Sequence, residues 1–182
     1  MMEATTSERL LDEAQRLVQL CGFNGFSYAD LSRAIGIAKP SIHYHFPSKQ
    51  DLGLQLVKRY RRNLQHGLAF VETNFPEPKI RLLRYVEFFG QLIQDGRLCL
   101  CSALAADAGS LSVEIQLELE AAFTDKISWL EQNLKSIGIP NPNIEAKQLV
   151  ATVDGAMVMA RAYQNTAMYN DICQKLLESY HP

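Results

Sequence analysis

Residues 27–46 read SYADLSRAIGIAKPSIHYHF, and this stretch decides the fold that the sequence predicts. Ser27 belongs to the residue types that cap helices, and Gly36 marks the end of the helix that Ser27 would begin. A second short helix then runs to Phe46, with Pro40 in its first turn, where a missing N–H costs nothing. Two short helices joined at a glycine turn are typical of a helix-turn-helix, whose second helix enters the major groove of DNA.

The side chains of this motif divide into an inner and an outer set. The apolar set would pack the two helices together and against a preceding helix: Leu31, Ile35, Ile37 and Ile42. We expect Phe46 to be a core residue beneath the second helix. The outer set is then Lys39, Ser41, His43, Tyr44 and His45. The N–H groups at the start of the helix capped by Ser27 would suit a phosphate oxygen.

Helical periodicity continues on both sides of the motif. Apolar residues recur at three- and four-residue steps from Ser7, the expected N-cap, to about Cys21, with Gly22 as a stop. Ser48 is the expected cap of the next helix. Further helices are predicted over about 48–75, 79–94, 98–110, 112–138, 144–164 and 168–180. No stretch shows convincing strand alternation, so the predicted fold class is all-α, with about nine helices.

Composition limits the kind of protein further. The chain has 182 residues, of which 47% are hydrophobic and 21% charged, which is ordinary for a globular protein. No apolar run reaches the ~18 residues of a membrane-spanning helix, and the polar N-terminus lacks the features of a secretion signal, so a cytoplasmic protein without a membrane partner is expected. The four scattered cysteines are expected to be reduced thiols.

Charge is distributed unevenly along the chain. Residues 1–62 carry nine Lys and Arg against six Asp and Glu, whereas the remainder carries nine against fourteen. A basic head on an acidic body favours a head that meets a polyanion. The basic run KRYRR at 58–62 could touch the DNA backbone, although a solvated helix face is at least as good an interpretation.

The run GFNGFSYADLSRAIGIAKPSIHYHFPSKQDL, at residues 22–52, resembles the DNA-binding segment of the TetR family of transcriptional regulators. The resemblance covers roughly residues 7–60, and it departs from the commonest pattern at Pro40 and His43. It implies a three-helix DNA-binding domain at 1–47. A helical ligand-binding and dimerisation domain would follow at 48–182, with 48–75 as the linking helix.

The resemblance also implies roles for individual residues. Phosphate anchors would be Ser27, Tyr28, Ser41, Tyr44 and Lys49. The residues nearest the base edges would be Lys39, Pro40 and His43, while His45 could serve either purpose. Double-stranded DNA is the implied partner, read by a homodimer at a palindromic operator with recognition helices ~34 Å apart. Small residues in the eighth predicted helix suit a dimer contact: Ala151, Gly155, Ala156, Ala160 and Ala162.

The predicted function is that of a transcriptional repressor released from DNA by a small-molecule effector. Residues expected to line an effector cavity are Tyr85, Phe88, Phe89, Cys99, Phe123, Trp129 and Tyr163, although each alone is also an ordinary core residue. Asp154, Arg161 and Gln164 could supply a polar group there. No cofactor is predicted.

Four other interpretations stay open or are set aside. Cys99 and Cys101 could form an electrophile or redox sensor, with Arg97 the only nearby cation, or they could be small apolar fillers. An enzyme is not expected, because no nucleophile–base signature or phosphate loop is present, and a helical interaction module remains an alternative. No metal is expected at His43 and His45, since neither Cys nor carboxylate joins them at ligand spacing.

Overall fold

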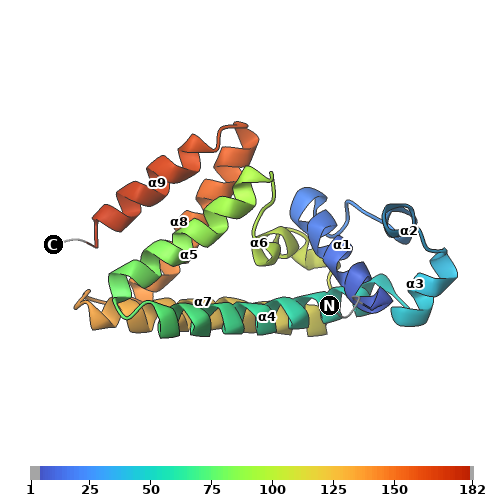
Figure 1. The fold of residues 1–182 in the computed structure, drawn as a ribbon, viewed down its shortest axis with the longest axis horizontal. Coiled ribbons are helices and arrows are strands. Elements are labelled where there is room, and N and C mark those ends of the chain that lie inside the picture. The colour runs from blue at the N-terminus through green and yellow to red at the C-terminus, as the bar shows by residue number, and fades with distance from the viewer. Residues whose placement is uncertain (1–4, 181–182) are drawn as a thin grey trace. The chain divides into compact units, whose positions relative to one another are not determined.

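A computed structural model describes residues 5–180 of the chain. Over that range the fold is entirely helical, which confirms the predicted class (Figure 1). The helices are α1 (Thr6–Cys21), α2 (Tyr28–Ile35), α3 (Lys39–His45), α4 (Lys49–Asn74), α5 (Pro78–Gln94), α6 (Leu100–Ala105), the 3₁₀ helix η1 (Ala108–Ser110), α7 (Val113–Ser136), α8 (Pro142–Ala162) and α9 (Ala167–Glu178). None of these helices is both long and apolar enough to span a bilayer.

The helices form two compact units. The N-terminal unit comprises the chain up to Arg62 together with Leu100–Ala121. The C-terminal unit comprises Asn63–Cys99 and the chain from Ala122 onward. Helices α4 and α7 each contribute residues to both units. These units group residues by packing, so the functional division between residues 47 and 48 stays a prediction.

The cap of the first helix, Thr5, lies two residues before the predicted cap, Ser7. The hydroxyl of Thr5 accepts the N–H of Glu8 at 3.2 Å, and the carboxylate of Glu8 accepts the N–H of Thr5 at 2.9 Å. The reciprocal pair satisfies two N–H groups at the helix end. Three residues after Ser7, the predicted cap, stands Leu10, whose apolar side chain cannot form such a pair. Ser7 lies inside α1 and is not its cap.

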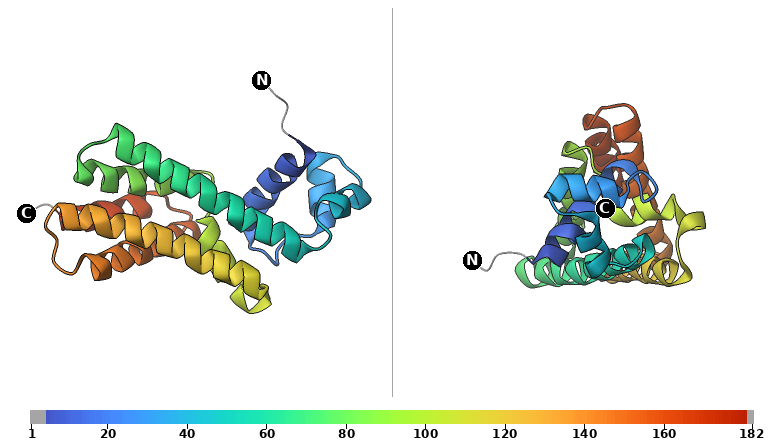
Figure 2. Two further views of the ribbon diagram at one scale, coloured as in Figure 1. Left: turned by 90° about the horizontal axis from the view of Figure 1, so that it is seen from below. Right: turned by 90° about the vertical axis from the view of Figure 1, so that its right-hand side faces the viewer.

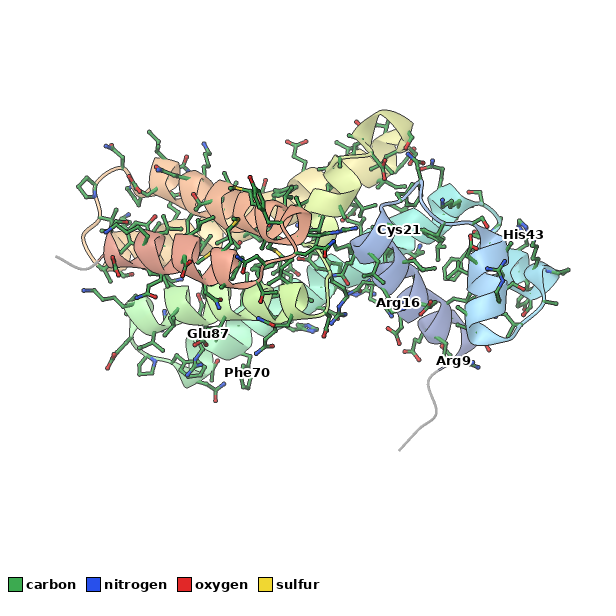
Figure 3. The ribbon with its side chains drawn as sticks, turned by 90° about the horizontal axis from the view of Figure 1, so that it is seen from above. Arg9, Arg16, Cys21, His43, Phe70 and Glu87 are labelled. Atoms are coloured by element: carbon green, nitrogen blue, oxygen red, sulfur yellow. The ribbon has the colours of Figure 1, made fainter. Side chains whose placement is uncertain are left out.

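The core of the N-terminal unit holds the helix-turn-helix against α1. Fully buried side chains come from each element: Leu10, Ala14, Val18, Leu31, Ile42, Leu52 and Leu56. Phe46 is also buried, which confirms its expected place in the core. Arg9 of α1 donates to the carbonyl of Ile35, at the end of α2, at 3.0 Å (Figure 3). These contacts fix α2 and leave one side of α3 to solvent.

Asp107, just after α6, fastens the connection between α1 and α2. Its carboxylate accepts the backbone N–H of Phe23 at 2.7 Å and that of Asn24 at 3.2 Å, and the Asn24 side chain donates to it at 3.0 Å. Gly22 precedes these residues with φ +80°, and a Cβ there would lie 2.9 Å from the Asp107 Oδ2. The turn therefore requires glycine for both its conformation and its close approach to Asp107.

In the C-terminal unit, α8 and α9 pack along each other and against α5 (Figures 1 and 2). Tyr169 of α9 is fully buried, and its hydroxyl donates to the Val86 carbonyl of α5 at 2.7 Å. Burial raises the pKa of the Tyr169 hydroxyl well above its ordinary value. Helices α5 and α9 are therefore joined by a buried hydrogen bond as well as by apolar contact.

Candidate nucleic-acid interface

The start of α2 is arranged by Ser27 and Asp30. The backbone N–H and the hydroxyl of Ser27 donate to Asp30 Oδ2 at 2.8 and 2.7 Å. These hydrogen bonds lower the pKa of the exposed Asp30 carboxyl below its ordinary value. The pair confirms Ser27 as the helix cap. A phosphate that binds Ser27 would have to draw its hydroxyl away from Asp30.

Gly36 shapes the turn between α2 and α3. It has φ +72° and ψ +32°, the left-handed conformation that glycine adopts without strain. The Ser32 hydroxyl closes the turn by donating to the Ile37 carbonyl at 2.6 Å. Ile42 then points fully into the core, as the sequence predicts.

The opposite side of α3 is open to solvent. Lys39, Pro40 and His43 are exposed, Ser41 and His45 are half-buried, and Tyr44 is 85% exposed. Figure 3 shows where His43 lies on this helix. The Nδ1 of His43 lies 3.1 Å from the Pro47 carbonyl, which can only accept, so Nδ1 carries the hydrogen. In the neutral ring the other nitrogen, Nε2, is then an acceptor.

Tyr28 connects α2 to the end of α3. Its hydroxyl lies within hydrogen-bond distance of two carbonyls, those of Phe46 at 2.9 Å and Ser48 at 2.6 Å. Burial, with a smaller contribution from Asp51, raises the pKa of Tyr28 to about 12. Its ring meets that of His43 edge-on at 4.9 Å. Tyr28 thus has a structural role beside its predicted phosphate contact.

Lys49, at the start of α4, likewise has a structural role beside its predicted phosphate contact. Its ammonium donates to the Phe26 carbonyl and lies 4.3 Å from the centre of the Phe26 ring and 4.8 Å from that of Phe23. Partial burial lowers the pKa of Lys49. The sequence pattern predicts the phosphate contact but gives no sign of this attachment, because Phe23 and Phe26 lie more than twenty residues away.

A surface cavity of about 430 Å³ brings five of the nine predicted DNA-binding residues together. Its lining is Phe26, Ser27, Tyr28, Ala29, Lys39, His43 and Lys49. Two lysines, two hydroxyl-bearing residues and a histidine around one hollow suit an anion such as a phosphate. Pro40, Ser41, Tyr44 and His45 lie outside this lining.

Two arginines of the basic run at 58–62 form ion pairs within the N-terminal unit. Arg59 pairs with Asp12 at 2.7 Å, and Arg61 pairs with Glu118 at 3.4 Å. These ion pairs explain two of the basic residues without DNA. The exposed face of α3 is therefore the better candidate for the nucleic-acid contact.

The predicted effector residues are only partly brought together in the C-terminal unit. Tyr85, Phe89, Cys99 and Trp129 are buried and Phe123 is half-buried, whereas Phe88 and Tyr163 are exposed, Tyr163 to 69%. Lys126, which is not among the predicted effector residues, is also fully buried. Its spacing of three residues from both Phe123 and Trp129 is the signal that could have identified it.

Cys99 has a different cationic neighbour from the one expected. Arg97 forms an ion pair with Asp95, whereas the Lys126 ammonium lies 3.6 Å from the Cys99 sulfur. Cys99 and Cys101 are both fully buried. Among residues 5–180, no group of three or more His, Cys, Asp or Glu side chains is arranged to hold a metal ion.

Comparison with known proteins gives matches to transcriptional regulators. Residues 10–56 match a family model described as bacterial regulatory proteins, tetR family. A TetR-family regulator from Agrobacterium tumefaciens is 34% identical, with a TM-score of 0.90 over 95% of this chain and 96% of that one. A TetR regulator from Legionella pneumophila is 30% identical, with a TM-score of 0.92 over 98% and 99%. The HTH-type transcriptional repressor DhaR of Mycobacterium sp. is 22% identical over 100% of this chain and 96% of its own length.

Proposed function

Because this chain belongs to the TetR family of transcriptional regulators, it is a DNA-binding regulator, and we propose that it acts as a repressor. In this proposal a homodimer occupies a palindromic operator until a small-molecule effector releases it. DhaR, which is similar over 96% of its length, is named a repressor, and this supports repression rather than activation. The proteins matched above are transcriptional regulators rather than enzymes.

The exposed face of α3 is the observation that carries the proposal. Lys39 and Tyr44 project from a helix whose opposite side is anchored by the fully buried Ile42. A large aromatic side chain that is 85% exposed has few apolar contacts within the unit, and a DNA backbone would supply them. Lys39 would donate to guanine O6 and N7, while His43 Nε2 would accept from the amino group of adenine or cytosine.

An exposed face of α8 supports the homodimer. Ala151, Gly155 and Ala162 of the predicted set are exposed, together with Val158 and Met159, at three- and four-residue steps. Ala156 and Ala160 were wrongly included in that set, because they are buried inside the protomer. Small residues beside exposed apolar ones allow a twofold-related copy of the helix to approach closely. Two heads held by such a contact would read two half-sites.

The effector would act by favouring a form of the dimer whose recognition helices are wrongly spaced for the operator. A complete switch requires a preference of ~10⁴-fold, or about 5.5 kcal/mol, for the released form. We assign the transmission to α4, because this continuous helix begins next to the predicted DNA contacts and continues into the C-terminal unit.

Selection of duplex fragments by the purified full-length chain tests the DNA contact. Lys39→Ala with Tyr44→Ala should abolish specific capture, because it removes a base contact of about 1–3 kcal/mol together with a phosphate anchor. The matched control, Lys135→Ala with Phe70→Ala, removes an exposed cation and an exposed aromatic outside the predicted interface and should bind normally. Affinity should fall steeply with salt through counterion release. Specific capture that survives the α3 substitutions would overturn the proposal.

The contact between Cys99 and Lys126 favours a second candidate, a repressor released by electrophiles or oxidants. An adjacent ammonium stabilises a thiolate, the nucleophilic form of cysteine, whereas complete burial restricts access to it. Replacing Cys99 and Cys101 with serine should then eliminate release by such reagents. Unchanged release in the double serine variant would exclude this candidate.

A further inference from the structure

We propose that the effector carries a carboxylate on an aromatic or aliphatic body, and that Lys126 is the residue that binds it. The inference rests on the proposed function, since it names the chemical class of the effector. It is carried by a cluster inside the C-terminal unit, formed by Lys126 and Trp129 of α7, Asp154 of α8 and the rings of Phe89 and Phe123.

The cluster contains a charge that packing alone does not require. The Lys126 side chain is fully buried, and its ammonium lies 3.7 Å from Asp154 Oδ2 and 3.6 Å from the Cys99 sulfur. Removing an ammonium and a carboxylate from water costs several kcal/mol for each ion, and apolar residues of similar volume are often as stable or more so. A lysine at this position therefore indicates a use for its charge.

Aromatic rings line the surroundings of the ammonium. It lies 4.3 Å from the centre of the Phe123 ring and 5.7 Å from that of Phe89. Tyr85 meets Phe89 edge-on at 5.0 Å and stacks on Trp129 at 6.2 Å. Such walls suit the apolar body of a ligand. A cationic ligand fits poorly, because Lys126 already occupies the ring faces that would attract it.

Trp129 supplies a second, independent indication of an acceptor. It lies three residues after Lys126 on α7, so both side chains are on the same side of that helix. The indole N–H is buried and has no hydrogen-bond partner among the described residues. A buried donor without an acceptor costs ~1–3 kcal/mol, which a ligand oxygen would recover.

Asp154 is the group that a ligand carboxylate would replace beside the Lys126 ammonium. Its Oδ2 lies 3.7 Å from the Lys126 ammonium, and its side chain is 13% exposed, so it can turn toward water. A ligand carboxylate would take its place beside the ammonium and keep the charges balanced. Because Asp154 belongs to α8, which also carries the proposed dimer face, this exchange would alter that helix directly.

The single tryptophan of the chain, Trp129, reports on this cluster directly. Its fluorescence in the full-length protein is titrated with phenylacetate, 4-phenylbutyrate and octanoate, and with the primary amide of each. At least one acid should bind ten times or more tightly than its amide. Lys126→Met should reduce that ratio to near one, whereas Lys135→Met, an exposed lysine of the same helix, should preserve it. Asp154→Asn should tighten binding of the acid severalfold and leave the amide unchanged.

The inference is overturned if no acid outbinds its amide in the native protein, or if Lys126→Met keeps the preference. Should Lys126→Met fail to fold by circular dichroism, the native ratios and Asp154→Asn decide the question. Capture of operator DNA is measured separately. A carboxylate preference without DNA capture would refute the proposed function alone, and DNA capture without the preference would refute this inference alone.

Discussion

Replacing Asp107 with alanine should destabilise the DNA-binding head although Asp107 lies outside it in sequence. The substitution removes the acceptor of three hydrogen bonds, from the backbone N–H groups of Phe23 and Asn24 and from the Asn24 side chain. The N–H of Phe23 is half-buried and donates to a charged oxygen at 2.7 Å, so it contributes most. We expect a loss of about 2–3 kcal/mol, since hydrogen bonds to charged groups contribute ~1.5–3 kcal/mol and exposed ones less.

Thermal unfolding followed by circular dichroism measures this loss. For a chain of this length each kcal/mol lowers the melting temperature by ~2–4 °C, so a decrease of roughly 5–10 °C is expected. Asp107→Asn keeps one carbonyl acceptor and should lose less. Operator affinity should fall as well, because the ring of Phe23 lies beneath the ammonium of Lys49.

A double-mutant cycle with Gly22→Ala makes the prediction sharper. The new Cβ would meet Asp107 Oδ2 at 2.9 Å and would also be strained at φ +80°. Without Asp107 only the strain remains, at ~1–2 kcal/mol, so the two substitutions should cost less together than the sum of their separate effects. An Asp107→Ala protein that melts at the native temperature would refute the reasoning.

The remaining predictions concern the capping, turn and dimer residues. The hydrogen bonds from Ser27 lower the pKa of Asp30 in the folded state. The stabilisation that they give is therefore present above the ordinary pKa of 3.8 and is lost as the pH falls through the lowered pKa. The melting temperature of Asp30→Ala should lie below that of the native protein at neutral pH and converge with it in acid. Gly36→Ala should cost ~0.5–1.5 kcal/mol in urea unfolding, because left-handed strain exceeds the gain in chain entropy, and Gly36→Asn should cost less. Val158→Glu should produce monomers in sedimentation, whereas Val113→Glu, at a more exposed valine, should not.

Local signals account for the part of the fold that the sequence predicts well. Ser27, Gly36 and Ser48 act on groups within about four residues, so their roles follow from the sequence alone. The predicted cap at Ser7 is wrong, because Thr5 and Glu8 form the reciprocal pair of hydrogen bonds that begins the helix two residues earlier.

Contacts between distant residues account for what the sequence does not predict. Asp107 meets Phe23 across 84 positions, and no pattern near either residue indicates the pairing. Likewise Lys126 reaches Cys99 across 27 positions, whereas Arg97, the neighbour in sequence, pairs with Asp95. The predicted DNA contacts rest on the resemblance. For Tyr28 and Lys49 the structure adds hydrogen-bond partners that are distant in sequence and that only the packed fold brings close.

The hydrogen bonds from the α1–α2 turn to Asp107 also affect how the DNA-binding head can be transferred to another protein. A chimera that grafts only residues 1–62 onto a foreign sensor would leave the amides of Phe23 and Asn24 without their carboxylate acceptor. Transplanting Leu100–Ala121 together with the head would restore it. Recombination between paralogues should thus keep these two separated stretches together.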